Sequence, residues 1–367
     1  RAEGSCSRRD FATMETQDLN SESILPPGPR WSPDHLRLHR HLRHHPELLP
    51  AGAPLLLAIS GGQDSMALLA LLRDLQRLHH WPLHLWHGDH RWRPESGQVA
   101  AELAGWCSDQ GLKLHVSAWL RPPEATSEAD ARHWRYGQLA EQARCLGVGH
   151  VVTAHTASDR AETLLLHLAR GSHRRGLASL RSLRLLSTDA SEPIALARPL
   201  LPFSRADTAR LCQQLKLPIW QDPSNTDRRY SRNRIRAEVV PVLEELHPGA
   251  AQRISAQAER LVEEVESSNE LVNLALQTLK TVASHDGAPG LQRQELGDLA
   301  LANQRQLLHH WLEQGTSLSL PARQLEELLR RLQPGHPPGQ ADLGAGWQLR
   351  WDRCTLWLHP PAAQLPQ

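Results

Sequence analysis

Residues 54–79 read PLLLAISGGQDSMALLALLRDLQRLH, and this stretch decides the fold class. Its residues 55–59 are an unbroken apolar run, which is typical of a short strand buried on both faces. From residue 65 to residue 79 the leucines recur at helical spacing, which predicts an amphipathic helix. A short turn with two glycines connects them, as in the strand–turn–helix unit of a parallel sheet.

The same alternation continues along the chain. Further strands are predicted at residues 83–87, 112–117 and 150–154, and further helices at residues 95–109, 127–146 and 158–170. Short strands separated by longer helices predict an α/β fold, a doubly wound parallel sheet with helices on both faces. Because ligands bind beyond the carboxyl ends of the strands in such sheets, functional motifs are expected there.

The chain is predicted to have two folded parts and a tail. After about residue 245 helical stretches dominate, at residues 247–280, 303–313 and 321–332, and residues 347–359 alternate as in a hairpin. We therefore expect a disordered tail at residues 1–32, a catalytic α/β domain at residues 33–245, and a second, mostly helical domain at residues 246–362.

Composition limits the class of protein. With 41 Lys and Arg against 40 Asp and Glu, the net charge of +1 indicates no polyanion binding by itself. No apolar run is long enough to cross a bilayer, and no apolar signal segment suggests export. The five cysteines are scattered without a C-x-x-C pair, so the sequence indicates neither a zinc site nor a dithiol pair, and we expect a cytoplasmic protein.

The turn after the first strand carries the chemistry. Its sequence SGGQDS, at residues 60–65, offers consecutive backbone N–H groups, two hydroxyls and the positive end of a helix to one anion. We predict a pyrophosphate cradle with the nucleotide-binding residues Ser60, Gly61, Gly62, Gln63, Asp64 and Ser65. The turn lacks the lysine of the Walker A motif, so Mg²⁺ and arginines from elsewhere are expected to neutralise a triphosphate. The alternative is a tight turn without a ligand.

The hexapeptide resembles that of the PP-loop ATP pyrophosphatase superfamily, whose members cleave ATP between the α and β phosphates. Other motifs, in the same order along residues 50–245, are similar to those of the bacterial tRNA(Ile)-lysidine synthetases. They are HGDH at residues 87–90, ARHWRY at residues 131–136, DxxET at residues 159–163, RGS at residues 170–172, RPLL at residues 198–201, and WxDPSNxD followed by YxRNxIR at residues 220–236.

This resemblance implies a two-step ligation. The family joins free L-lysine to C2 of the wobble cytidine of a CAU-anticodon tRNA(Ile), through an adenylated intermediate, and releases AMP and diphosphate. The modified tRNA then reads AUA instead of AUG. The implied cofactors are ATP and Mg²⁺, and the implied partners are that tRNA and free lysine. The oligomeric state stays open, with a homodimer as one alternative.

The candidate catalytic residues that the resemblance implies are Asp64, Asp159, Glu162 and Arg132. Asp159 and Glu162 lie one helical turn apart and share a face, so they could hold Mg²⁺ or the ammonium groups of lysine. The metal is expected at Asp64 and Asp159. The simpler alternatives are an acidic first turn that stabilises its helix, and a surface ion pair for Arg132. Ser158 stands where the family often has Asp, which removes one potential Mg²⁺ ligand.

Polar residues also follow the second predicted strand. His87, Asp89 and His90 lie beside the loop in this fold, so they are candidates for catalysis or for contacts to a base. A structural role is the alternative for each. Arg91 stands where the family usually has glycine.

Two segments are locally basic although the chain as a whole is not. Residues 163–188 contain five arginines and no acidic residue, and residues 228–236 contain five more arginines. The predicted tRNA-binding residues are Arg174, Arg175, Arg228, Arg229, Arg232 and Arg234. Phosphate contacts from such clusters give a salt-dependent affinity for RNA. A solvated charged face is the alternative.

Three other functions compete with this interpretation. A PP-loop tRNA thiolase would commonly use cysteine pairs or an iron–sulfur cluster, which the scattered cysteines disfavour. A PP-loop amide synthetase for a small metabolite would have no use for the arginine clusters. A non-catalytic RNA-binding protein would have no reason to keep both hydroxyls and Asp64 in the loop.

Overall fold

The computed structural model describes residues 31–91, 96–119, 128–172, 174–187, 193–220, 228–282 and 289–361. The chain divides into two compact units, Arg1–Val262 and Glu263–Gln367. Of the predicted tail at residues 1–32, only Trp31 and Ser32 are among the described residues. Within the described part of the chain, no helix has the length and apolar character needed to cross a membrane.

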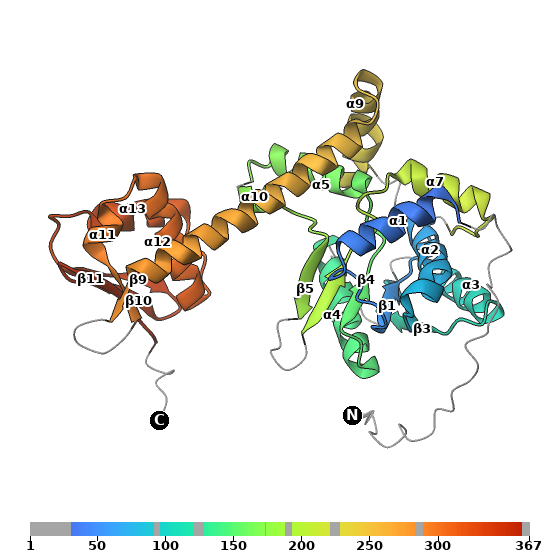
Figure 1. Ribbon diagram of the computed structural model, residues 1–367, viewed down its shortest axis with the longest axis horizontal. Coiled ribbons are helices and arrows are strands. Elements are labelled where there is room, and N and C mark those ends of the chain that lie inside the picture. Colours follow the sequence, from blue (N-terminus) through green and yellow to red (C-terminus); the bar gives the residue numbers. More distant parts are fainter. Residues whose placement is uncertain are drawn as a thin grey trace, which may run out of the picture. The chain divides into compact units, whose positions relative to one another are not determined.

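The first unit contains a six-stranded sheet with the order β3-β2-β1-β4-β6-β5 (Figure 1). The strands are β1 (Leu55–Ala58), β2 (Leu83–Asp89), β3 (Leu114–Ala118), β4 (His150–Val152), β5 (Leu183–Ser187) and β6 (Ile194–Ala197). All neighbouring pairs are parallel except β5 and β6, which run antiparallel at one edge. The predicted parallel sheet is confirmed, and the edge pair is an addition that the alternating pattern did not reveal.

Helices cover both faces of this sheet. Successive residues of β1 point to opposite faces, so they enter two different cores. Leu55 and Leu57 belong to the core beneath α2, whereas Leu56 belongs to the core beneath α4. The helices of this unit are α1 (Pro33–His44), α2 (Gln63–His79), α3 (Ser96–Asp109), α4 (Glu128–Leu146), α5 (Ala157–Ala169), α6 (Arg174–Leu177), α7 (Arg205–Gln214), α8 (Ser231–Arg234), the π-helix η2 (Ile235–Val239) and α9 (Val240–Leu246). The helix α10 (Ala250–Leu279) begins in the first unit and ends in the second. The doubly wound arrangement is therefore confirmed.

The second unit combines helices with a five-stranded antiparallel sheet of order β7-β8-β11-β10-β9. Its elements are β7 (Lys280–Val282), β8 (Pro289–Gln292), α11 (Arg293–Gly297), α12 (Leu301–Thr316), α13 (Ala322–Leu332), β9 (Gly339–Gly344), β10 (Trp347–Trp351) and β11 (Thr355–His359). The predicted hairpin is confirmed as β10 and β11, which pair antiparallel. The three other strands, β7, β8 and β9, were not predicted.

Candidate functional site

The loop between β1 and α2 is closed by its own hydroxyls. The Oγ atoms of Ser60 and Ser65 lie 3.2 Å apart, and the Gly62 N–H donates to Ser60 Oγ at 3.2 Å. Ser65 Oγ also donates to the Gly62 carbonyl at 2.8 Å. Gly62 is the N-cap residue of α2, so the loop delivers the N-terminal end of that helix to the carboxyl edge of the sheet. Positive potential and free N–H groups at a helix start favour a phosphate group.

Gly61 is required at its position for two reasons. Its backbone has φ +79°, the left-handed conformation that glycine adopts without strain. The Trp220 N–H donates to the Gly61 carbonyl at 3.0 Å, and a Cβ atom on Gly61 would lie 3.2 Å from Trp220 Cε3. The sequence predicted the turn but not the tryptophan that covers it.

Gln63 and Asp64 connect the loop to α7. Gln63 Nε2 donates to the Arg205 carbonyl at 2.7 Å and to Thr208 Oγ1 at 2.9 Å. The Thr208 hydroxyl donates to Asp64 Oδ1 at 2.5 Å, and Thr208 is only 1% exposed. The Gln63 side chain thus orients the loop instead of facing a nucleotide, and only its backbone N–H remains for one. Thr208 is a functional candidate that the sequence analysis missed, since nothing in its local sequence distinguishes it.

Burial raises the pKa of the Asp64 carboxyl, and the nearby charge of Asp159 raises it further. The hydrogen bond from Thr208 acts in the opposite direction and lowers this pKa. The ionised form of Asp64 is therefore disfavoured in this partly buried position, and a nearby cation would stabilise it.

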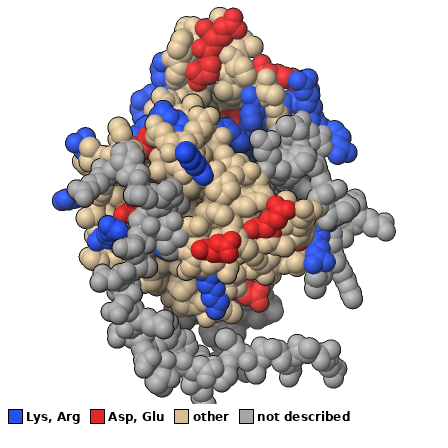
Figure 2. Space-filling model, turned by 90° about the vertical axis from the view of Figure 1, so that its right-hand side faces the viewer, with Lys and Arg blue, Asp and Glu red and all other residues tan. Residues whose placement is uncertain are grey.

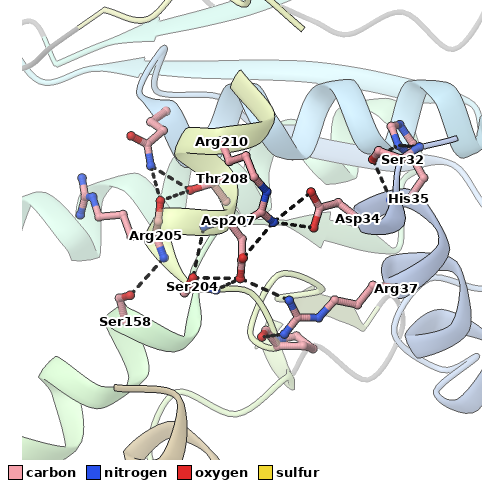
Figure 3. Close-up of polar contacts among 12 residues, drawn as sticks. Ser32, Asp34, His35, Arg37, Ser158, Ser204, Arg205, Asp207, Thr208 and Arg210 are labelled. Carbon is pink, nitrogen blue, oxygen red and sulfur yellow. Dashed lines mark hydrogen bonds and ion pairs between the residues drawn. The ribbon is translucent and has the colours of Figure 1, made fainter. Parts of the chain in front are cut away.

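The N-terminus of α7 is itself fixed by neighbouring elements (Figure 3). Ser204 and Asp207 form a capping box, and Asp207 also accepts from Arg37 and Arg210. Ser158, at the start of α5, accepts from the Arg205 N–H through its Oγ at 3.2 Å. The serine that replaces a potential metal ligand therefore links α5 to α7.

Asp159 and Glu162 lie on one face of α5, as predicted, and two arginines bind them. Arg232 donates to Asp159 Oδ1 and to Glu162 Oε2, both at 2.9 Å. Arg236 donates to Glu162 Oε1 at 2.7 Å and lies 3.4 Å from Asp159 Oδ1. Asp159 is 9% exposed and Glu162 is 1% exposed, so this is a nearly buried cluster of two positive and two negative charges.

This cluster affects the roles predicted for its members. Arg232 holds the pKa of Asp159 below its usual range even though burial acts to raise it. Because the guanidinium of Arg232 already binds carboxylates, a tRNA phosphate would have to compete with them. The neighbouring His155 stays neutral, since burial and then Arg198 lower its pKa.

The predicted residues after β2 have defined contacts. His87 is buried with Nδ1 2.7 Å from the Ile59 carbonyl, and burial lowers its pKa, so a neutral ring bound to the main chain fits best. Asp89 Oδ1 accepts from the Arg91 N–H at 2.9 Å. Arg91 has φ +51°, which explains physically why glycine suits this position in relatives of the same pattern. His90 lies beside Arg135, with 3.0 Å between His90 Nε2 and Arg135 Nη2.

The side chains of the other predicted tRNA-binding arginines that the structure describes are exposed. Arg228 is 74% exposed, with a distant 3.8 Å contact to Glu238, and Arg234 pairs with the same glutamate at 3.1 Å. Arg174 and Arg229 are exposed. The side chain of Arg175 and the motif at residues 221–227 lie outside the described residues. In Figure 2, the Lys and Arg side chains of the described residues are spread over the visible face, with Asp and Glu among them.

The chain matches two known sequence families, described as the PP-loop domain over residues 37–243 and the TilS substrate binding domain over residues 291–357. It is 54% identical over 333 residues to a tRNA(Ile)-lysidine synthase of Parasynechococcus marenigrum, covering 91% of this chain and 96% of that protein. It is 42% identical over 346 residues to a tRNA(Ile)-lysidine synthase of Prochlorococcus marinus, covering 92% of this chain and 99% of that protein.

Among solved structures, the chain is similar to the U34-tRNA thiolase of Methanococcus maripaludis, with a TM-score of 0.53 and 16% sequence identity. The match covers 62% of this chain and 78% of the thiolase. At this identity the likeness concerns the fold alone.

Proposed function

This chain belongs to the tRNA(Ile)-lysidine synthase family, and we infer that it catalyses the ligation of lysine to C2 of the wobble cytidine of CAU-anticodon tRNA(Ile). ATP is cleaved to AMP and diphosphate in this reaction, and the product tRNA reads AUA instead of AUG. The observation that carries the inference is the SGGQDS loop at the carboxyl edge of the sheet, in a chain related over nearly its whole length to these synthases.

The loop suits the first step of the reaction. The backbone N–H groups at the start of α2 would bind the β and γ phosphates, leaving the α phosphorus open to attack. O2 of the cytidine attacks that phosphorus and diphosphate leaves. The lysine amine then attacks C2, and AMP departs with the former O2. Residues 33–245 are proposed as the domain for this chemistry, and residues 246–362 as the part that grips the tRNA body.

The donor atoms support a magnesium ion at Asp64 more than at Asp159. Asp64 Oδ1 accepts from Thr208, and Oδ2 has no partner among the described residues, so it is available as a hard oxygen ligand. Asp159 already accepts from Thr156 twice through Oδ2 and meets Arg232 and Arg236 through Oδ1. These four contacts use the lone pairs of the carboxylate. When bound, Mg²⁺ would offset phosphate charge; Asp159 would have to release an arginine to join it.

Lysine recognition is proposed at the same carboxylate cluster. Asp159 and Glu162 already bind the positive charges of Arg232 and Arg236. An ammonium group of lysine carries the same charge and would take the place of one of these guanidinium groups. Arg132 lies beside Tyr136 in α4, and its positive charge suits contact with a phosphate of either ATP or the tRNA. Because the substrate is a tRNA, we propose that the protein acts in the cytoplasm. A homodimer stays a prediction that sedimentation velocity would decide.

The thiolase alternative is less well supported. Burial raises the pKa of Cys107 and of Cys212 to about 11, so both stay protonated at neutral pH and are poor sulfur nucleophiles. The described cysteines are all unpaired thiols, and the two exposed ones are Cys145 and Cys354.

A labelling assay tests the proposed function. Purified protein with ATP, Mg²⁺, radiolabelled lysine and CAU-anticodon tRNA(Ile) should give labelled tRNA together with AMP and diphosphate. A tRNA with a different wobble base is the matched control and should stay unlabelled. Release of ADP and orthophosphate, or labelling from cysteine sulfur, would contradict the assignment.

A further inference from the structure

Three arginines gather around the side chain of Tyr136 in α4. Arg132 lies one turn earlier in the same helix, with its Cζ 5.5 Å from the centre of the tyrosine ring. Arg184, on the edge strand β5, has its Cζ 4.8 Å from the same centre. Arg198 follows β6 directly and is hydrogen-bonded to the tyrosine side chain. An aromatic face attracts a guanidinium, but it does not cancel the mutual repulsion of three positive charges.

The charge of these arginines is not neutralised by the described part of the chain. None of the three has a carboxylate within ion-pair distance among the described residues. Arg198 is 1% exposed, and while its Nη1 donates to the Arg181 carbonyl at 2.5 Å, its Nε is buried without a hydrogen-bond acceptor. Burial lowers the pKa of Arg198 to about 10, and the charges of Arg184 and Arg132 contribute to the lowering. A buried cation of this kind is costly unless an anion accompanies it.

The carboxylate cluster on α5 provides a contrast within the same unit. There Arg232 and Arg236 are matched one for one by Asp159 and Glu162. In that cluster the positive charge of the arginines is therefore matched by acids. Around Tyr136 the positive charge is left in excess. Arg132 and Arg184 are exposed to solvent, so an anion can reach these arginines.

We propose that Arg132, Arg184 and Arg198 bind a backbone phosphate of the tRNA anticodon strand. The proposal rests on the proposed function, which supplies the RNA. Planar guanidinium groups match phosphate oxygens in geometry as well as in charge.

The sheet order favours RNA over ATP as the source of that phosphate. β5, which carries Arg184, is three strands from β1, which carries the nucleotide loop. At the usual ~4.8 Å between neighbouring strands, this separation is about 14 Å. The phosphates of a nucleotide held at residues 60–65 therefore lie near the middle of the sheet, away from Arg184 at its edge, while a strand of RNA can span both positions.

Binding of a CAU-anticodon stem–loop RNA tests the proposal, measured by fluorescence anisotropy over a series of KCl concentrations without lysine. Arg184→Gln should weaken binding about fivefold and lower the slope of log K against log[KCl] by about 1. Arg77→Gln, which removes an exposed arginine from α2, is the matched control and should change neither. Arg184→Lys keeps the charge and should restore the slope while recovering part of the affinity.

Each result decides the proposal. An unchanged slope for Arg184→Gln, with thermal unfolding like that of the unmodified protein, would overturn it and leave the arginines a packing role on Tyr136. A higher KM for ATP with unchanged RNA affinity would assign the phosphate to the nucleotide, which also overturns it. RNA binding needs no turnover, so the two proposals can be separated. If the unmodified protein forms no lysidine and Arg184→Gln still lowers the salt slope, the proposed function is refuted and the phosphate site is kept.

Discussion

The hydroxyl of Thr208 lies 2.5 Å from Oδ1 of Asp64, and this contact joins α7 to the nucleotide loop. The same hydroxyl accepts from Gln63 Nε2, so one buried side chain orients two successive loop residues. It also limits the directions in which the Asp64 carboxylate can point, and leaves Oδ2 as the oxygen available for a cation.

Replacing Thr208 with valine should therefore lower the rate of diphosphate release about tenfold, since one net hydrogen bond of ~1–1.5 kcal/mol is lost at Asp64. Thr208→Ser keeps the hydroxyl and should restore most of the rate. If the serine variant were as slow as the valine variant, the effect would come from packing and not from the hydrogen bond.

Asp64→Asn should abolish turnover while tRNA affinity is kept, because the substitution removes the charge for the cation and leaves the arginines intact. It should also raise Tm in the absence of ATP and Mg²⁺, by about 2–4 °C for each kcal/mol gained. Burial raises the pKa of Asp64 in the folded protein, so the ionised carboxylate destabilises the fold at neutral pH.

The pH dependence of Tm tests whether the charge of Asp64 destabilises the folded protein. As the pH falls through the folded-state pKa of Asp64, the carboxyl of the unmodified protein takes up a proton. The destabilisation caused by its charge then disappears. The Tm difference from Asp64→Asn should therefore shrink toward acid pH. A difference that grows on acidification, or loss of tRNA binding in the variant, would contradict the role of Asp64.

Arg236→Met should destabilise the protein by about 2–3 kcal/mol, because Glu162 is left in a buried position with one arginine instead of two. The value lies below that of a fully buried pair because the Arg236 side chain is 23% exposed. Denaturant unfolding measures it. Arg234→Met, which breaks an exposed pair with Glu238, is the matched control and should leave the unfolding midpoint nearly unchanged.

Changing Arg228 and Arg229 together to glutamine should weaken tRNA binding and reduce its salt slope by about 2, since both side chains are exposed for phosphate contacts. The same pair of changes at Arg40 and Arg43 on α1 removes equal charge elsewhere and should leave the slope unchanged. Equal slopes for the two double variants would refute a specific phosphate role for Arg228 and Arg229.

The parts of the fold that follow from local pattern were predictable from the sequence. The apolar run at residues 55–59 and the leucines of residues 65–79 became β1 and α2, and the shared face of Asp159 and Glu162 followed from helical spacing. β5 was not predicted, because an exposed edge strand lacks the continuous apolar run of a buried one.

The partners of the site residues could not be predicted, because they come from distant parts of the chain. Arg232 belongs to a segment whose composition indicates RNA binding, yet its guanidinium binds carboxylates of α5. Thr208 has an ordinary place in an ordinary helix, and only the packing of α7 against the loop gives it a role. Local periodicity predicts which residues share one face of a helix, but not which distant residues contact that face.

The hydrogen bond between Trp220 and Gly61 has a consequence for biosynthesis. On a translating ribosome β1 and α2 emerge long before the tryptophan that covers their turn, and contacts between such distant positions form slowly. A nascent chain therefore possesses the hexapeptide well before it possesses the finished nucleotide site. The contact that covers the turn at Gly61 can form only after residue 220 has been synthesised.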